Sequence, residues 1–277
     1  MDVDTLDDQA RGLRMVARTA NPRIVSVVSG KGGVGKTFVS TSLALCAAKQ
    51  GQRVLLIDGD LSLANVDVAL GLRCRHNLAD VINGKVSFHE ALALGPEGIF
   101  LLPATSGVAD LAQIDDALQQ RILAVLQPQL GAFDLVVIDC GAGVGSNVVF
   151  FGRAAEDSLL VLTPEPTSLS DAYATIKVLH RSAGIDVIDV VVNQASDSVA
   201  RDVFRRLSTV VGQFLSVRLR FKASIPLDDG VRQAIIARRP LVLSQAGAPA
   251  SMAMMLLSKA MMLEARPLRP GLLKAPW

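Results

Sequence analysis

The chain has no uninterrupted apolar run that approaches the roughly 18–20 residues needed to cross a bilayer. Its first ten residues, MDVDTLDDQA, are acidic and have no apolar core, so they do not predict a secretion signal. These two absences predict a protein that works in the cytoplasm and is at most attached to the surface of a membrane.

Cysteine is also scarce. The three cysteines, Cys46, Cys74 and Cys140, are far apart and form no C-x-x-C motif, which fits a reducing compartment and argues against structural zinc. The three histidines are scattered and have no metal-ligand spacing. Because no histidine lies near Cys140 in sequence, we interpret it as a small buried residue rather than a nucleophile.

A large excess of either charge is missing too. The 28 basic and 26 acidic residues give a net charge of +2, which predicts neither a protein that coats nucleic acid nor an acidic, solvating one. There is no internal repeat, low-complexity tract or long linker. Half of the 277 residues are hydrophobic, so the chain can bury a large core.

The most informative stretch is glycine-rich, residues 29–37, and reads S-G-K-G-G-V-G-K-T. It follows the β-branched run 23–28 and precedes an alanine- and leucine-rich stretch that ends near Gln50. Glycine tolerates positive φ, so successive N–H groups can converge on a phosphate at the start of the next helix. This context predicts a nucleotide-binding loop rather than a plain tight turn. The predicted nucleotide-binding residues of the loop are Gly30, Lys31, Gly32, Gly33, Val34, Gly35, Lys36, Thr37 and Phe38.

Short apolar runs alternate with helical patterns along the rest of the chain. The predicted strands are 23–28, 53–58, 99–102, 134–139, 158–163, 187–193 and, more weakly, 220–225. The predicted helices are 108–130, 167–182, 197–213, 228–238 and 249–265. Continuous Val/Ile/Leu strands separated by helices predict a mostly parallel sheet covered on both faces. The expected fold class is α/β: a single-domain P-loop NTPase with a doubly wound sheet.

Polar residues close several of these strands, where ligands bind in parallel α/β sheets. Asp58 and Asp60 stand at i and i+2, so that one can support Mg²⁺ while the other orients or deprotonates an attacking water. The alternative is a turn with solvated Asp residues, followed by a helix that starts at Asn65/Asp67. Asp139 opens into C-G-A-G-V-G, the usual setting of a Walker B acid. The base-binding candidates at later strand ends are Asn193, Pro226 and Asp228; for Asn193, a loop amide whose hydrogen bonds are satisfied within the protein is the alternative.

The first 21 residues predict a helical appendage. Leu6, Ala10, Leu13 and Ala17 share one helical face, but Gly12 weakens such a helix by about 1 kcal/mol relative to Ala. A helix that orders on a partner and a frayed terminus both fit this composition.

With the loop and the strand-end carboxylates in place, the sequence resembles the MinD/ParA group of deviant Walker A ATPases over about residues 22–250. K-G-G-V-G-K-T is highly specific for this group, and D-G-D-x-x-x-A-N-V-D and D-x-G-A-G support it. Within the group, the chain looks most like the flagellar number and placement regulators, the FlhG/FleN/YlxH branch. Two segments favour that branch: D-L-S-L-A-N-V-D-V-A-L-G-L at 60–72 and D-Q-A-x-x-L-R at 8–14.

The resemblance implies a role for each candidate. Lys31 is the signature lysine that crosses an ATP-dependent homodimer to the other subunit's phosphates, Lys36 holds the β- and γ-phosphates, and Asp60 positions the hydrolytic water. These three are the predicted catalytic residues, with ATP or ADP and Mg²⁺ as cofactors. The implied metal-site residues are Thr37, Asp58 and Asp139, and Asn193 is implied to contact adenine. The implied partner-binding residues are Asp8, Gln9, Ala10, Leu13 and Arg14.

The same resemblance divides the chain into a partner-binding appendage (1–21), a MinD-like ATPase domain (22–265) and a tail (266–277). It implies a switch with slow, regulatory ATP turnover that controls flagellar number or placement. The implied partners are a flagellar GTPase of the signal-recognition-particle class (FlhF-like) and flagellar switch-ring or transcriptional regulator proteins, at the inner face of the membrane or the cell pole.

Three features depart from the group. Phe38 stands where a small hydroxyl or polar residue is usual, and Ser62 replaces a frequent glycine and should stiffen the first switch. Relatives carry an amphipathic membrane-targeting helix at the C-terminus, whereas 251–265 is apolar almost all round and predicts a packed helix. The short apolar tail that follows predicts at most a weak membrane contact.

Three alternative functions remain open. Division-site placement or DNA partition would use a basic cluster to bind phosphates, although a solvated surface explains such clusters more often, and DNA is not the expected partner. An iron–sulfur carrier would need a close pair of cysteines, which the sequence lacks. A scaffold with negligible hydrolysis is the third. The basic cluster consists of Arg201, Arg205, Arg206, Arg218, Arg220 and Lys222.

Overall fold

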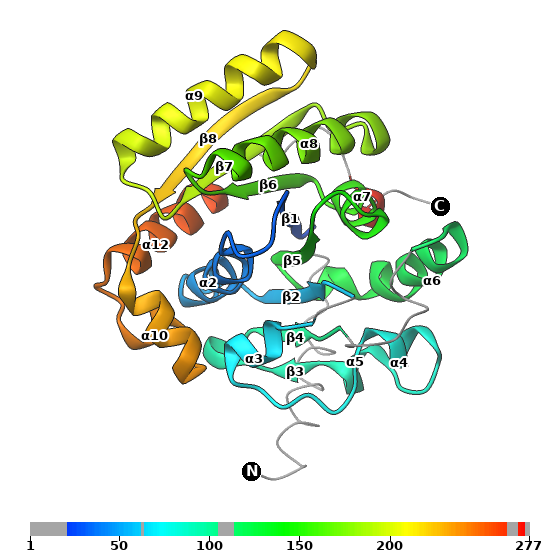
Figure 1. The fold of residues 1–277 in the computed structure, drawn as a ribbon. Helices are drawn as coiled ribbons and strands as arrows, with labels where there is room; N and C mark the ends of the chain where they lie inside the picture. Colours follow the sequence, from blue (N-terminus) through cyan, green and yellow to red (C-terminus); the bar gives the residue numbers. More distant parts are fainter. Residues whose placement is uncertain (1–20, 62–63, 105–113, 265–270, 275–277) are drawn as a thin grey trace.

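The computed structural model describes residues 21–61, 64–104, 114–264 and 271–274 (Figure 1). Three of the sequence expectations therefore lie wholly or mostly outside the described residues: the partner-binding appendage, the effect of Ser62, and the membrane contact of the tail 266–277, of which only 271–274 are described. The appendage residues concerned are Asp8, Gln9, Ala10, Leu13 and Arg14.

An eight-stranded sheet forms the middle layer, in the order β3-β4-β2-β5-β1-β6-β7-β8 (Figure 1). Neighbouring strands are parallel except β3 and β4, and the order reverses at β1. The prediction of a mostly parallel, doubly wound sheet is confirmed. The strands are β1 (Arg23–Ser29), β2 (Val54–Gly59), β3 (Ala93–Leu94), β4 (Phe100–Leu102), β5 (Leu135–Ala142), β6 (Asp157–Leu162), β7 (Val187–Asn193) and β8 (Arg218–Ile225).

β1 lies between β5 and β6, and all seven of its residues are buried. Side chains of a strand alternate between the two faces, so an unbroken Ile/Val run offers apolar groups to both helical layers. Ile24 and Val28 belong to the core on one face, and Val25 and Val27 to the core on the other. The register pairs Val27 with Asp139 of β5, which brings this acid beside the end of β1.

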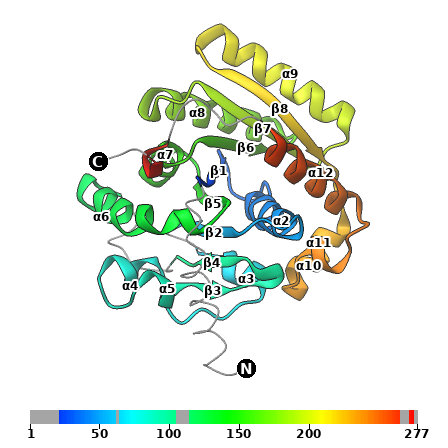
Figure 2. The same ribbon diagram turned by 180° about the vertical axis from the view of Figure 1, so that it is seen from behind.

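Helices cover both faces of the sheet (Figure 1, Figure 2). One layer contains α2 (Lys36–Lys49), α3 (Val66–Leu70), α10 (Asp229–Ala237), α11 (Leu241–Ser244) and α12 (Pro249–Leu263). The other contains α4 (Leu78–Ile82), α5 (Phe88–Ala91), α6 (Asp116–Leu126), α7 (Ser146–Ala154), α8 (Pro166–Ala183) and α9 (Asp197–Phe214). The described residues also form the short 3₁₀ turns η1 (Pro96–Gly98), η3 (Gln127–Ala132) and η4 (Leu272–Lys274).

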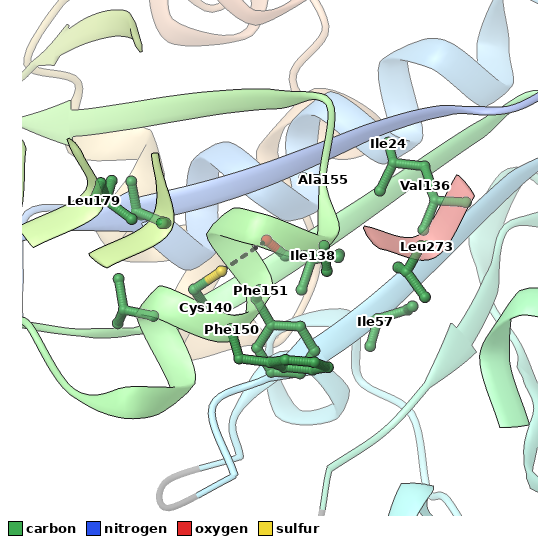
Figure 3. Packing of buried hydrophobic residues seen from close by; sticks show 14 of the residues in the cluster. Ile24, Ile57, Val136, Ile138, Cys140, Phe150, Phe151, Ala155, Leu179 and Leu273 are labelled. Carbon is green, nitrogen blue, oxygen red and sulfur yellow. Dashed lines mark hydrogen bonds between the residues drawn. The ribbon is translucent and has the colours of Figure 1, made fainter. Parts of the chain in front are cut away.

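The core beneath α7 is built around two neighbouring aromatic rings (Figure 3). The ring centroids of Phe150 and Phe151 are 5.0 Å apart, and both side chains are buried. Ile57, Ile138 and Cys140 from β2 and β5 belong to the same cluster. Burial raises the pKa of the Cys140 thiol well above its ordinary value, in keeping with a small core residue rather than a nucleophile.

α7 was not predicted. Its sequence, SNVVFFGRA, is rich in β-branched and aromatic residues that favour strands. The helix packs closely on α8: a Cβ at Gly152 would lie 2.8 Å from Cδ2 of Leu179, so the glycine permits a close approach of the two helices.

The predicted helix 108–130 is too long within the described residues. α6 begins at Asp116, because the Asp115 side chain caps it by accepting a hydrogen bond from the Leu118 N–H at 2.8 Å. It ends at Leu126, since Pro128 has no N–H to continue the α-helical ladder and η3 follows.

The other predicted strands and helices agree with the structure to within two residues at each end, apart from β5, which continues to Ala142. The weakly predicted strand 220–225 is a full strand, β8, at the sheet edge. The short elements β3, α4, α5 and α11 were not predicted, and α3 begins after Asn65, where the sequence offered a helix start as the alternative. Across the described ranges, no helix is both long and apolar enough to span a membrane.

α12 is packed on one face only. Met254 and Met261 are fully buried against the layer that contains α2, as a packed helix requires. Met252, Leu256 and Leu263 lie on the outer face and are 51%, 69% and 77% exposed. One side of α12 therefore packs in the core, and apolar side chains on its other side are exposed to solvent.

Candidate functional site

The glycine-rich loop joins the carboxyl end of β1 to the start of α2. α2 begins at Lys36, and Gly35 before it has φ 88°, in the left-handed region that favours glycine. Gly33 has φ 82°, and nothing lies within 4 Å of where its Cβ would be, so this part of the loop faces open space. The strand–loop–helix context expected of a phosphate site is present.

The loop is braced at both ends by other elements. A Cβ at Gly30 would lie 2.2 Å from the backbone oxygen of Asp171 on α8. A Cβ at Gly35 would lie 2.3 Å from Nδ2 of Asn193 at the end of β7. Glycine at these positions lets neighbouring elements touch the loop backbone directly.

Asp139 is the centre of a buried polar cluster. Its Oδ1 lies 3.1 Å from Nζ of Lys36 and accepts a hydrogen bond from Oγ of Ser40 at 2.8 Å; its Oδ2 accepts one from Oγ1 of Thr37 at 2.7 Å. Lys36 is 8% exposed and Asp139 is 2% exposed. Three residues from the first turns of α2 therefore converge on one carboxylate.

Asp58 lies beside Asp139 in the β2–β5 register and is almost fully buried. Its carboxylate accepts hydrogen bonds from the backbone N–H groups of Asp60, Asn65 and Val66 at 3.1–3.2 Å, and so caps the start of α3. Burial, and then the charge of Asp139, raises the pKa of Asp58 to about 7. Two adjacent buried acids favour the arrival of a cation.

Asp60 is half-buried and directed toward the glycine turn that follows β5. Its Cγ lies 3.6 Å from where a Cβ of Gly141 would be. In the same turn, Gly143 has φ 92° and donates its N–H to the backbone oxygen of Ser29 at 2.8 Å. The turn therefore touches both the end of β1 and the segment after β2.

Lys31 makes contacts separate from those of Lys36. Its Nζ donates to the carboxylate of Glu165 and, at 3.2 Å, to Oγ1 of Thr167 at the start of α8. Its side chain remains 35% exposed. The two lysines of the loop therefore pair with different acids: Lys36 with buried Asp139, and Lys31 with exposed Glu165.

The predicted base-binding residues have structural partners in this conformation. Nδ2 of Asn193 donates to the backbone oxygen of Val34 at 2.8 Å. Asp228 caps α10 through the N–H of Gly230 at 2.9 Å and accepts the N–H of Ala250 on α12 at 3.2 Å. Pro226 is half-buried between β8 and that cap. Adenine contact by these residues stays a prediction.

Phe38, near the start of α2, is partly buried and packs against the core cluster on that face of the sheet.

The residues around Asp139 fit magnesium in the way nucleotide-dependent sites usually hold it. Within the described ranges, no group of three or more His, Cys, Asp or Glu side chains could form a metal cage. Mg²⁺ normally takes one or two protein ligands and completes its shell with water and phosphate oxygens. The Thr37 hydroxyl and the adjacent acids Asp139 and Asp58 supply that donor set.

Three contact residues were not anticipated from the sequence. Ser40 lies one helical turn after Lys36, so its spacing could have signalled a shared face of α2. Glu165 and Thr167 are more than 130 positions away from Lys31, and no local pattern reveals that pairing.

The basic cluster and the cysteines are poorly suited to the alternative functions, DNA binding and iron–sulfur transfer. Five of the six residues in the basic cluster form ion pairs with carboxylates of the same chain, so most of its charge is neutralised. Cys46 and Cys140 are fully buried, and Cys74 is half-buried. A cluster bridged between subunits would need accessible thiols.

The doubly wound sheet and the glycine loop at its switch point define the class of P-loop NTPases. The chain belongs to the ParA/MinD family: a family profile described as "ParA: NUBPL iron-transfer P-loop NTPase" matches residues 21–262.

Two relatives and one solved structure mark its place in that family. The chain is 43% identical over 218 residues to the antiactivator FleN of Pseudomonas aeruginosa, covering 78% of each protein. It is 30% identical over 223 residues to the flagellum site-determining protein YlxH of Helicobacter pylori, covering 80% of this chain and 75% of the relative. The septum site-determining protein MinD of Pyrococcus horikoshii, complexed with Mg-ADP, superposes with a TM-score of 0.72 at 26% identity, covering 87% and 96%. The chain is an ATPase with ATP, ADP and Mg²⁺ as its cofactors.

Proposed function

We propose that this ATPase is a dimerising switch that regulates flagellar number or placement through partner proteins. The similarity to FleN over 78% of both chains supports this biological role. One observation carries the mechanism: Lys31 engages the exposed start of α8, whereas Lys36 engages buried Asp139. Because the Lys31 side chain is partly exposed, it can exchange Glu165 for the phosphates held by a second subunit.

Within one subunit, the binding step follows from the buried cluster. Lys36 would exchange Asp139 for the γ-phosphate of ATP, and Mg²⁺ held near Thr37 and Asp139 would neutralise phosphate charge. Thr37 and Asp139 then act as the metal-site pair, and Asp58 supports that region. Ser40 still holds Asp139 after the other two partners turn to the ligand. The cluster is therefore arranged to exchange an internal ion pair for a nucleotide.

Hydrolysis requires a positioned water and stabilisation of the charge that spreads over the γ-phosphate oxygens. Asp60, beside the Gly141 turn, orients the water. Lys31 from the facing subunit supplies the added positive charge, as an arginine finger does in other NTPases. Turnover then depends on dimerisation. The turn at Gly143, which lies between β5 and α7, changes conformation with the γ-phosphate and so moves the start of α7.

Partner selection is the part furthest from the nucleotide. The N-terminal segment, 1–21, is the proposed docking element for a flagellar GTPase of the signal-recognition-particle class, and switch-ring or transcriptional regulator proteins are the other proposed partners. The ATPase domain is 22–265 and the tail 266–277. The exposed apolar side of α12 is compatible with a weak contact at the inner membrane face or the cell pole.

The direct biochemical test uses Lys31→Ala and Asp60→Ala. Both should bind ATP with nearly unchanged affinity while kcat falls by about 100-fold or more, because each loses an interaction made mainly in the transition state. Lys85→Ala is a matched control, since Lys85 is an exposed lysine paired with Asp80 away from the loop. Unchanged turnover in both site variants would refute the mechanism.

The biological test is deletion of the gene in its own host, followed by a count of flagella per cell. An altered number or position is expected, and restoration by wild type but not by Asp60→Ala would tie it to turnover. Cells with normal flagella after deletion would refute the role while leaving the ATPase chemistry intact.

A further inference from the structure

The side-chain amide of Asn193 touches the phosphate loop rather than an open pocket. Asn193 is 5% exposed at the end of β7, and its Nδ2 donates to the Val34 backbone oxygen at 2.8 Å. The two residues are 159 positions apart, so a separate strand reaches into the loop. This contact bridges the predicted base-binding edge and the phosphate-binding loop.

We infer that Asn193 is a positioning residue for the phosphates, acting through the backbone of the loop. The inference rests on the proposed nucleotide site but assigns Asn193 a task that does not require it to read a base. It holds one peptide plane of the loop in the orientation that phosphate binding needs.

The geometry of a peptide explains how one contact can do this. The Val34–Gly35 peptide is planar and trans, so its C=O and N–H point in opposite directions. With the Val34 oxygen held against Asn193, the Gly35 N–H points away from Asn193. Gly35 immediately precedes α2, whose positive end attracts an anion.

Asn193 is itself fixed. Its Oδ1 accepts the N–H of Gln194 at 3.0 Å, and Gln194 has φ 59°, in the left-handed region. The next residue, Ala195, donates its N–H to the Ile225 oxygen of β8 at 3.0 Å. The amide is therefore oriented from both sides before any ligand arrives.

Gly35 shows how close this contact is. A Cβ at this position would lie 2.3 Å from Nδ2 of Asn193, and φ is 88°. Glycine is needed here for two independent reasons, backbone conformation and room for the amide. No phosphate-binding pattern in the sequence predicts the second.

The experiment compares ligands with and without a base. In Asn193→Ala, the Val34 oxygen loses its donor, so affinity should fall about 5- to 50-fold. If Asn193 positions the loop, the loss is similar for ATP, GTP and inorganic tripolyphosphate, measured by displacement of a fluorescent ATP analogue. If it only reads adenine, the loss is confined to ATP, and this outcome would overturn the inference. No loss for any ligand would overturn it too.

Two companions keep the test decisive if Asn193→Ala is unstable. Gln194→Gly keeps the backbone N–H and suits the positive φ, so all three affinities should stay near wild type. Hydrogen exchange of the peptide over 29–37 in nucleotide-free protein should rise in Asn193→Ala and not in Gln194→Gly, whereas equal exchange in both would contradict the inference. Wild-type ATP binding, measured first in the series, reports on the proposed function separately.

Discussion

The two ends of the sheet both bury lysine–aspartate pairs, but they use them differently. At the carboxyl end, Lys36 and Asp139 are 3.1 Å apart beside a glycine loop. At the amino end, Lys222 lies 3.5 Å from Asp189 and also pairs with Glu264, which follows α12.

The amino-end network closes on itself. Arg23 pairs with Asp157 at 2.7 Å and donates to the Met261 backbone oxygen near the end of α12, and Arg220 bridges Asp157 and Asp189. Its charges are matched by other side chains, and the network joins four strands, β1, β6, β7 and β8, to helix α12. Such pairs, once buried, are costly to break but need not add net stability.

The carboxyl-end cluster lies beside open space, since nothing is within 4 Å of a Cβ position at Gly32 or Gly33. The residues there can exchange internal partners for a ligand. A buried lysine–aspartate pair is therefore structural where other side chains enclose it, as at Lys222 and Asp189. It can bind a ligand where a glycine loop leaves open space beside it, as at Lys36 and Asp139. The predictions below separate the two.

The largest contrast is expected from a matched pair of substitutions. Lys36→Met should lower ATP affinity by at least about 100-fold, because the phosphates lose a cation, and should cost about 2–4 kcal/mol of stability, because buried Asp139 keeps only the neutral donors Thr37 and Ser40. Lys222→Met should leave ATP affinity within about twofold but lower the free energy of unfolding by roughly 1–3 kcal/mol, since the buried contact with Asp189 is lost while Arg220 still pairs with that acid. Calorimetric ATP titration and urea unfolding of both proteins measure this. Equal loss of stability and binding in the two variants would erase the distinction.

A smaller contrast involves two buried serines. Ser40→Ala should lower kcat about 5- to 20-fold with little change in KM, because Asp139 loses the donor that remains when nucleotide is bound. Ser26 is equally buried but bonds to Ser158 and to the Asp157 backbone oxygen. Ser26→Ala should leave kcat unchanged. Steady-state kinetics measure both variants, and an unchanged kcat in Ser40→Ala, or an equal loss in both, would contradict the role of Ser40.

The smallest expected effect is a pH dependence. The pKa of Asp58 is about 7 in the fold and about 4 when unfolded, so the folded state retains a proton that the unfolded chain releases. The contribution of Asp58 to stability therefore falls as the pH rises from 4 to 7. In EDTA and without nucleotide, urea unfolding at pH 5 and 8 should differ more for wild type than for Asp58→Asn, on the order of 1–3 kcal/mol. The same difference in both proteins would argue against this origin.

The sequence predicted most of the parts because their signals are local. The loop at 29–37, the buried runs that form β1, β2 and β5, and the acids that close them all lie within short windows. α7 was missed because its residues favour a strand, and its close approach to Leu179 on α8 at Gly152 is a tertiary contact that no local pattern shows. The pairing of Lys31 with Glu165 and of Asn193 with Val34 joins residues more than 130 positions apart. Such contacts follow from the tertiary fold, which no local pattern contains.

The central claim, that each active site is shared between two subunits, is tested most directly by mixing two inactive variants. In a mixed dimer of Lys31→Ala and Asp60→Ala, the Lys31→Ala subunit keeps its own Asp60 and receives Lys31 from its partner. Each variant alone should be inactive, and an equimolar mixture should regain about one quarter of wild-type ATP turnover, since half of the dimers would carry one complete site. A mixture as inactive as its components would mean that Lys31 serves its own subunit, and it would contradict the account.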